Sequence, residues 1–290
     1  MRHSPSLIGI ATATLTGAFA SGAFAQALET VGHPIPRGTG FQPAVTEMAR
    51  DAHNLDWMVL IIITVITAFV TLLLLVAAWR FNARRNPTPA TFTHNSPLEV
   101  AWTLIPILIL VFIGSFSLPA LFKSQEIPVG DITIKATGNQ WFWSYEYKGE
   151  DVAFDAYMIG APANDGKNMM TPEVEAQLIA AGYTKDDFLL ATDNAIVIPI
   201  NKVIVVEVTA ADVIHSWKVP AFGVMQDGVP GRLAHLWFKA EREGIYFGQC
   251  SELCGQDHSY MPITVKVVSQ AAYDAWLVGA KAGNVTLASN

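Results

Sequence analysis

The sequence predicts a two-helix transmembrane hairpin followed by an all-β domain, a Greek-key β-sandwich or barrel with a helical insertion and a C-terminal helix. Two observations lead to this fold class. Two uncharged apolar runs lie within the first 122 residues, and short alternating or β-branched segments separated by turn residues fill much of the remainder. Of the 290 residues, 51% are hydrophobic and only 15% are charged, which favours a membrane protein over a soluble domain.

The extreme N-terminus is typical of a secretory signal peptide over residues 1–25. Arg2 and His3 precede a short apolar segment that ends in small residues at alternate positions. We expect cleavage after Ala25, with cleavage after Ala20 as the alternative. A third membrane helix is a weaker interpretation, because Gly, Ser and Thr interrupt the run. Residues 26–56 would then form a periplasmic N-terminal segment.

Two segments, 57–79 and 100–122, are each long enough to cross a bilayer. Each contains 23 residues without a charge, and about 20 apolar residues span the hydrocarbon core. Trp57 and Trp79 bracket the first run, as expected for side chains at the two membrane–water interfaces. The sequence therefore predicts two transmembrane helices.

The connecting loop, residues 80–99, sets the orientation of the hairpin. It contains Arg80, Arg84 and Arg85, whereas Glu99 is its sole acidic residue. By the positive-inside rule this loop is cytoplasmic, so both termini and the β domain are periplasmic. The signal peptide predicts the same topology. For a bacterial chain, the expected location is the inner membrane.

Residues 123–290 form the predicted periplasmic domain. Seven segments have strand character, namely 131–137, 140–147, 195–200, 202–210, 233–240, 243–250 and 262–268. Residues 155–193 interrupt this pattern as an excursion, in which Thr171 would cap a helix that ends near Gly182. A final helix is expected to start near Ser269. The sequence does not decide whether the excursion covers the domain edge or contacts another subunit.

The same domain is acidic. It contains 20 Asp and Glu residues and 12 Lys and Arg residues, a net charge of −8. Such a surface attracts a basic soluble partner and repels nucleic acid, although ordinary solubility would also account for the charge. We therefore expect no nucleic-acid partner.

The segment CSELCGQDHSYM, residues 250–261, contains both cysteines of the chain, Cys250 and Cys254. It also contains His258 and Met261. Two periplasmic cysteines pair as a disulfide by default, and a zinc site is a second alternative. Thiolate, imidazole and thioether donors on a β domain are instead the combination that binds copper for electron transfer. His215, from VIHSW, offers a second imidazole. A mononuclear blue copper site needs a single cysteine, so the number of copper ions stays open at this point.

These residues carry a resemblance. The pattern C-S-E-L-C-G-x-x-H-x-x-M, together with VIHSW, DGVPGR and QWFWSYEY in this order, is similar to subunit II of bacterial haem–copper cytochrome c oxidases of the alphaproteobacterial aa3 type. The similarity runs from the first span to the C-terminal helix. It implies a cupredoxin-like β-sandwich or barrel with a binuclear CuA centre.

The resemblance also implies roles for individual residues. Cys250 and Cys254 would bridge two copper ions; one ion would add His215 and Met261, and the other His258 and the backbone carbonyl of Glu252. The Glu252 side chain would help to bind a magnesium or manganese ion shared with subunit I. Asp227 and Arg232 would help to order that interface.

Further roles concern electron and proton movement. Trp141 would receive electrons from cytochrome c, and Glu99 would lie at the mouth of a proton pathway into subunit I. Four acids would dock the basic cytochrome: Glu146, Asp155, Asp193 and Asp212. Each of these residues has an ordinary alternative, a core aromatic for Trp141 and a solvated charge for the acids.

The implied function is that of the electron-accepting subunit of an oxidase. The chain would take single electrons from ferrocytochrome c and pass them to haem in subunit I, where oxygen is reduced to water and protons are pumped. Further oxidase subunits would be partners. A quinol-oxidase subunit II would lack the copper ligands, and a membrane-anchored copper chaperone would need neither Trp141 nor Glu99. No Cys-x-x-Cys-His motif for covalent haem is present.

Overall fold

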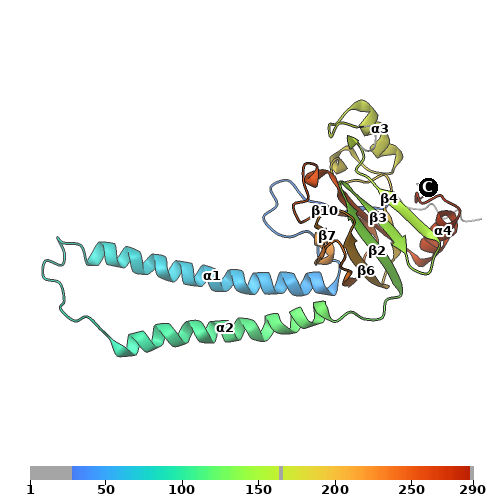
Figure 1. The fold of residues 1–290 in the computed structure, drawn as a ribbon. Helices are drawn as coiled ribbons and strands as arrows, with labels where there is room; N and C mark the ends of the chain where they lie inside the picture. The colour runs from blue at the N-terminus through green and yellow to red at the C-terminus, as the bar shows by residue number, and fades with distance from the viewer. Residues whose placement is uncertain (1–27, 163–165, 288–290) are drawn as a thin grey trace, which may run out of the picture.

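The computed structural model describes residues 28–162 and 166–287. The signal peptide over residues 1–25 and its cleavage site lie outside the described residues. Two long helices project from one side of a β domain (Figure 1). This arrangement confirms the predicted fold class of a helical hairpin followed by a β-sandwich with a helical insertion and a C-terminal helix.

The hairpin consists of α1 (Glu47–Arg80) and α2 (Ser96–Gln125). Both helices are longer than the apolar runs at 57–79 and 100–122. The side chain of Thr46 caps α1 and that of Asn95 caps α2, each by accepting a hydrogen bond from a backbone N–H of the first turn. These polar caps lie outside the apolar runs, so both helices continue beyond the predicted membrane spans.

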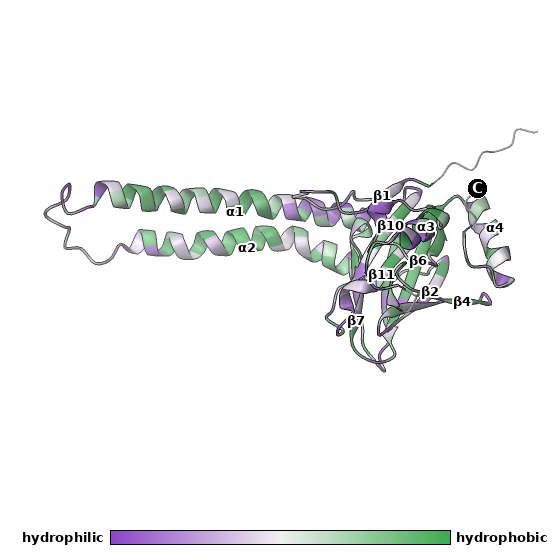
Figure 2. Ribbon diagram, turned by 90° about the horizontal axis from the view of Figure 1, so that it is seen from above, coloured by the Kyte–Doolittle hydropathy of each residue, from purple (hydrophilic) through white to green (hydrophobic). Residues whose placement is uncertain are grey.

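Both helices are long and apolar enough to cross a membrane, and their most apolar stretches are not buried within the chain. The ribbon coloured by hydropathy shows mostly hydrophobic residues along both helices, with hydrophilic residues toward their ends (Figure 2). Ion pairs attach the hairpin at its domain end. Lys123 of α2 contacts Asp51 of α1 at 2.9 Å, and Arg50 of α1 contacts Glu241 of the β domain at 2.7 Å. The chain is thus a membrane protein whose spans are anchored to its β domain.

Two sheets form the β domain. The first has the order β5-β11-β10-β7-β8, with β1 paired to β10, and the second has the order β4-β3-β2-β6-β9. The strands of the first sheet are β1 (Thr30–Gly32), β5 (Ile196–Pro199), β7 (His215–Val219), β8 (Val224–Gly228), β10 (Gly244–Cys250) and β11 (Pro262–Val268). Those of the second sheet are β2 (Ile132–Asn139), β3 (Phe142–Tyr147), β4 (Val152–Ala156), β6 (Val203–Ala210) and β9 (Ala234–Lys239).

The main core lies between the sheets, where large aromatic side chains are fully buried. Trp143 of β3, Trp217 of β7 and Phe238 of β9 belong to it. Alternation along the strands sends every second side chain inward, as the period of a β-strand requires. On β3, for example, Trp143 and Tyr145 are buried while Glu146 is exposed.

The excursion covers the outer face of the first sheet. It contains α3 (Pro172–Ala180) and the short η2 turn (Lys185–Asp187). Val174 and Leu178 of α3 pack with Ile245 and Phe247 of β10 in a second, smaller core. The structure therefore favours a cover over the domain for this segment. Thr171 caps α3 as predicted.

The C-terminal helix α4 (Gln270–Lys281) begins after Ser269, whose side chain accepts a hydrogen bond from the Ala272 N–H. It lies on the side of the domain away from the hairpin (Figures 1 and 2). Its Trp276 is buried and stacks in a tilted arrangement on Tyr147, with ring centroids 5.2 Å apart. The helix thus closes the far end of the core.

Candidate metal centre

Strand pairing brings the candidate ligands together. Cys250 is the last residue of β10, which pairs antiparallel with β7, and Cys250 lies opposite Trp217. His215 is the first residue of β7, so this register places its side chain beside the end of β10. The chain then returns to β11 through a loop that contains Cys254, the short turn η4 (His258–Tyr260) and Met261. The ends of two paired strands and one connecting loop thus supply the whole set.

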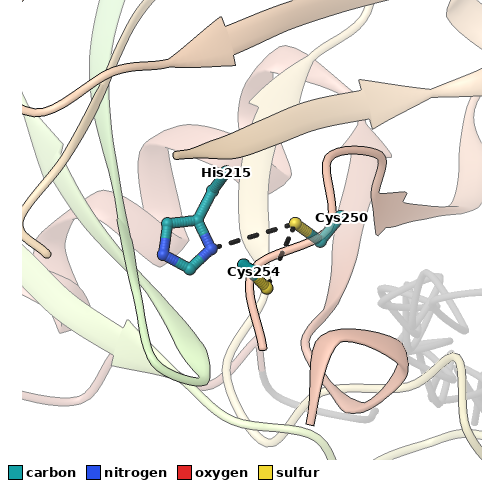
Figure 3. A group of neighbouring side chains, drawn as sticks. All are labelled: His215, Cys250 and Cys254. Atoms are coloured by element: carbon teal, nitrogen blue, oxygen red, sulfur yellow. Dashed lines mark hydrogen bonds between the residues drawn. The ribbon is translucent and has the colours of Figure 1, made fainter. Parts of the chain in front are cut away.

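The two cysteines are free and buried. Their sulfur atoms lie 3.8 Å apart, whereas a disulfide bond is about 2.05 Å long. The Nδ1 atom of His215 is 3.9 Å from the Cys250 sulfur, and the ligating atoms of these three residues lie within 4.8 Å of one another. Figure 3 shows the imidazole directed at the thiol pair. The structure therefore presents two thiols and an imidazole in the arrangement of a metal site.

Three further donors surround the sulfur pair. The His258 Nδ1 atom lies 3.4 Å from the Cys254 sulfur, and the Met261 sulfur lies 3.5 Å from it. The backbone carbonyl oxygen of Glu252 is 3.3 Å from the Cys250 sulfur. All six ligand atoms named from the sequence are consequently gathered around one pair of thiols.

The two thiols ionise differently. Burial opposes ionisation of Cys250, but its contacts with His215 and with backbone groups bring its pKa below the ordinary cysteine value. Burial and the neighbouring charge on Cys250 raise the pKa of Cys254 to about 12. Cys250 therefore loses its proton more readily than Cys254, and a bound cation favours removal of the proton from Cys254 at neutral pH.

The donor chemistry suits copper. Two thiolates, two imidazoles and a thioether are soft or borderline ligands, and thioether sulfur has little place in zinc sites. The two sulfur atoms lie side by side, with His215 next to Cys250 and His258 next to Cys254, so both can serve as shared ligands. The residues present fit a copper group without rearrangement of the backbone.

Gly138 makes room for His215, a role that was not predicted from the sequence. A Cβ atom on Gly138 of β2 would lie 2.7 Å from Cγ of the imidazole, closer than side chains tolerate. A glycine inside a strand pattern is a signal of close approach by another group, and that signal was available at this position.

The turn between β2 and β3 also contacts the loop between β10 and β11, residues 251–261, which we call the copper loop. The Gln140 side-chain amide and the Trp141 indole nitrogen each donate a hydrogen bond to the Cys254 carbonyl oxygen, at 3.0 and 3.2 Å. Within β3, the Trp143 indole donates to the Met261 carbonyl oxygen at 3.2 Å. Trp141 is half-buried and Trp143 fully buried, so the first is a surface group on the site and the second belongs to the core.

Comparison with known proteins identifies the family. Residues 132–268 match the family model described as cytochrome c oxidase subunit II, periplasmic domain, and residues 34–120 match the transmembrane domain of the same subunit. Cytochrome c oxidase subunit 2 of Cereibacter sphaeroides is 63% identical over 291 residues, which cover 100% of this chain and 96% of the relative. This chain belongs to the cytochrome c oxidase subunit II family.

Two other relatives extend the comparison. The probable cytochrome c oxidase subunit 2 of Rickettsia bellii is 40% identical over 263 residues, covering 89% of this chain and 91% of the relative. A crystal structure of the periplasmic domain of subunit II of cytochrome oxidase from Bradyrhizobium japonicum shares 44% identity, with a TM-score of 0.44. It covers 55% of this chain and 99% of that domain. As a family member, this chain is part of an oxidase complex, and its family normally binds copper.

The four candidate docking acids of this subunit II differ in their surroundings. Glu146 is exposed and forms ion pairs with Lys148 and Lys135 at 3.4 and 3.9 Å. Asp155, also exposed, accepts a hydrogen bond of 2.6 Å from the Ser144 hydroxyl. Both lie on the outer face of the second sheet and remain accessible to a partner.

Asp193 and Asp212 are occupied by local hydrogen bonds. The half-buried Asp193 accepts hydrogen bonds from the backbone N–H groups of Tyr157 and Asn194, and so joins the two ends of the excursion. Burial raises the pKa of its carboxyl group. Asp212 contacts His215, and both of its oxygens are engaged. For these two acids the structure shows a local bonding role that the sequence did not predict.

The remaining predicted residues lie apart from the sulfur pair. The Glu252 side chain points to solvent from the copper loop, while Asp227 is on β8 and Arg232 follows in the next turn. Glu99 lies in the first turn of α2, where its carboxylate accepts a hydrogen bond from the Asn95 N–H at 3.1 Å. This first turn of α2 is at the end of the hairpin remote from the β domain (Figure 1).

Proposed function

We propose that this subunit II accepts single electrons from ferrocytochrome c at a binuclear CuA centre and passes them to haem in subunit I, which reduces oxygen to water and pumps protons. The observation that carries the proposal is the pair of free thiols 3.8 Å apart, surrounded by two imidazoles, a thioether and a carbonyl oxygen. Two copper ions that share an electron across short sulfur bridges change geometry little on transfer.

The protein contributes a rigid frame for that chemistry. Cys250 and His215 are fixed by the pairing of β7 with β10, and the copper loop is held by hydrogen bonds from Gln140, Trp141 and Trp143. Because strand pairing and these hydrogen bonds hold the backbone around the ligands, the ligands would need little reorganisation on metal binding. The assignment of His215 and Met261 to one ion, and of His258 and the Glu252 carbonyl to the other, is part of this proposal.

Electron paramagnetic resonance of the copper-loaded full chain in detergent tests the proposal. One unpaired electron shared by two copper nuclei gives a seven-line hyperfine pattern, and we expect this pattern with two copper ions per chain. Cys254→Ser should abolish it, whereas His235→Ala, on the exposed face of β9, should leave it intact. A four-line pattern in the wild-type chain would mean isolated copper and would overturn the binuclear assignment.

We also propose a second metal at the subunit interface. The Glu252 carboxylate is exposed between the two cysteines, so it is free to bind magnesium or manganese together with groups of subunit I. Asp227 and Arg232 would order that interface. Manganese bound to the wild-type oxidase complex, and lost in Glu252→Gln while the copper signal persists, is the expected result.

Electrons would reach the centre through Trp141, and exposed acids such as Glu146 and Asp155 would hold the basic cytochrome. The net charge of −8 over residues 123–290 supports this docking mode. Glu99 would admit protons to subunit I from the cytoplasmic side of the bacterial inner membrane. The arginines of the 80–99 loop support that orientation.

Two rival functions are less well supported. A quinol-oxidase subunit would have no use for six gathered copper ligands. A copper chaperone needs exposed, exchangeable thiols, whereas both cysteines are buried here. The oxidase role accounts for both observations.

A further inference from the structure

Asp212 makes three hydrogen bonds that leave neither of its oxygens free. Oδ1 lies 2.9 Å from Nε2 of His215 and accepts the backbone N–H of Val213 at 2.7 Å. Oδ2 accepts the backbone N–H of Gln140 at 2.7 Å. A carboxylate that only supplied surface charge would not need this bonding. The contacts join the loop before β7 to the turn between β2 and β3.

The first of these bonds determines which nitrogen of His215 faces the thiols. The imidazole is fully buried, and its Nδ1 atom is directed at the Cys250 sulfur. When Nε2 carries the proton and donates it to Asp212, the Nδ1 lone pair is free for a metal ion. Gly138 leaves room for the ring in this position, because a Cβ atom there would overlap the imidazole.

The bond to Gln140 acts on the opposite side of the thiol pair. Asp212 holds the Gln140 backbone, while the Gln140 side chain donates to the Cys254 carbonyl oxygen at 3.0 Å. The Trp141 indole, one residue later, donates to the same oxygen at 3.2 Å. One carboxylate therefore anchors both the ligand beside Cys250 and the turn that holds Cys254.

We propose that Asp212 is a positioning residue of the metal centre, which fixes the tautomer and orientation of His215 and the placement of the Gln140–Trp141 turn. This inference rests on the proposed function, since it takes His215 and the two cysteines as copper ligands. It assigns Asp212 a role different from that of an acid that merely attracts cytochrome c. Glu146 and Asp155, whose carboxylates are paired only with side chains of the outer sheet face, keep the docking role.

A charge-conserving substitution separates the two roles. Asp212→Glu keeps the negative charge but moves the carboxylate away from the three donors by one methylene. Asp212→Asn keeps the shape and an acceptor for His215, but it removes the charge and turns an N–H donor toward the Gln140 N–H. The matched control is Asp151→Asn, which removes an exposed charge from the turn before β4.

The full chain, loaded with copper in detergent, is compared for hyperfine pattern, midpoint potential and copper retained against a chelator. We expect Asp212→Glu and Asp212→Asn to shift the spectrum and potential and to weaken copper retention by roughly 10- to 100-fold, as is usual when a partner of a ligating histidine is lost. Asp151→Asn should match the wild type. Unchanged circular dichroism shows that each variant has folded.

A different set of results would overturn the positioning role of Asp212. If Asp212→Glu matches the wild type in spectrum, potential and copper retention, while Asp212→Asn changes only the salt dependence of cytochrome c oxidation, Asp212 is a docking acid. Failure of the proposed function looks different, because the wild type itself would then lack the seven-line pattern. A readout without copper is the ¹⁵N shift of the His215 ring in the metal-free chain. We expect a protonated Nε2 in the wild type and a larger share of the Nδ1-protonated tautomer in Asp212→Asn, because a neutral amide oxygen is a weaker acceptor than a carboxylate.

Discussion

The indole nitrogen of Trp141 donates a hydrogen bond of 3.2 Å to the backbone carbonyl oxygen of Cys254. A half-buried aromatic ring thus touches the residue that carries one of the two central thiols. Gly255 makes this approach possible, since its φ of +120° is unfavourable for other residues and a Cβ there would lie 3.1 Å from the Trp141 ring. Under the proposed function, this contact would give electrons from a docked partner a short covalent and hydrogen-bonded path to the sulfur pair.

Trp141→Phe should therefore slow electron transfer from cytochrome c without removing copper. The variant keeps an aromatic ring but loses the hydrogen bond to Cys254, so we expect kcat/KM to fall by roughly tenfold or more, equivalent to about 1.4 kcal/mol. Stopped-flow oxidation of cytochrome c by the oxidase complex measures the rate, and metal analysis measures the copper. Loss of copper from this variant would instead make Trp141 a structural residue.

Trp143→Phe, two residues later and within β3, is the matched control. Its indole is fully buried and donates to the Met261 carbonyl oxygen. Removing a buried hydrogen bond leaves that oxygen unpaired and costs about 1–3 kcal/mol. We expect lower stability and a perturbed copper spectrum, in contrast to the purely kinetic effect at Trp141.

Gly138→Ala should displace His215. The added methyl group would lie 2.7 Å from Cγ of the imidazole, and the ring is fully buried, so it can shift only by disturbing its neighbours. Overpacking of this kind costs about 1–3 kcal/mol, and we expect copper content to drop more steeply than stability. Thr137→Ala, the neighbouring position with a half-buried side chain, is the control for effects on β2 itself. Full copper occupancy with an unchanged hyperfine pattern in Gly138→Ala would contradict the close approach.

Copper uptake should release protons, with Cys254 as a principal source. Its pKa of about 12 in the metal-free protein means that the thiol is protonated at neutral pH. Binding of copper must displace that proton, so apparent affinity rises about tenfold per pH unit for each proton released. Titration of the metal-free chain in buffers of different ionisation enthalpy counts the protons. Cys254→Ser should reduce the count, and a count unaffected by this substitution would contradict the assignment.

Much of the fold could be predicted because its signals are local. Uncharged runs of 23 residues revealed the hairpin, and alternation revealed the longer strands. The strands β1, β4, β7 and β8 were not predicted, since each has only three to five residues and includes polar residues or glycine, whereas the equally short β5 is a run of Ile, Val and Pro. The cupredoxin-like pairing of the sheets came from the family resemblance and not from the local pattern.

In the metal centre, likewise, the local features could be predicted and the long-range contacts could not. Cys250, Cys254, His258 and Met261 are close in sequence, so their spacing alone indicated a metal site. The contacts of Gln140 with Asp212 and with Cys254 join residues 72 and 114 positions apart, and nothing local announces them. The burial of Lys266 was hidden for the same reason. Its strand alternates as if the lysine faced water, but the excursion covers that face.

Lys266→Met should stabilise the β domain. Lys266 is only 7% exposed, and its ammonium group contacts the Ala181 carbonyl oxygen at 3.4 Å and the Tyr183 ring at 4.7 Å, both in the excursion. Burial lowers its pKa to about 8 from the ordinary value of 10.5. This difference corresponds to at most about 3 kcal/mol of destabilisation by the charged form.

The pH dependence follows from the sign of the shift. Between about pH 8 and 10.5 the unfolded chain still holds a proton that the folded chain has released, so the free energy of unfolding rises with pH in this window. Below pH 8 both states are protonated and the full cost remains. Lys266→Met should therefore gain most below pH 8 and lose its advantage as the pH approaches 10.5. Urea unfolding of the metal-free full chain in detergent, followed by tryptophan fluorescence, measures the difference against Lys239→Met, an exposed control on β9. A gain independent of pH would mean that packing of the methionine, and not removal of a buried charge, stabilises the variant.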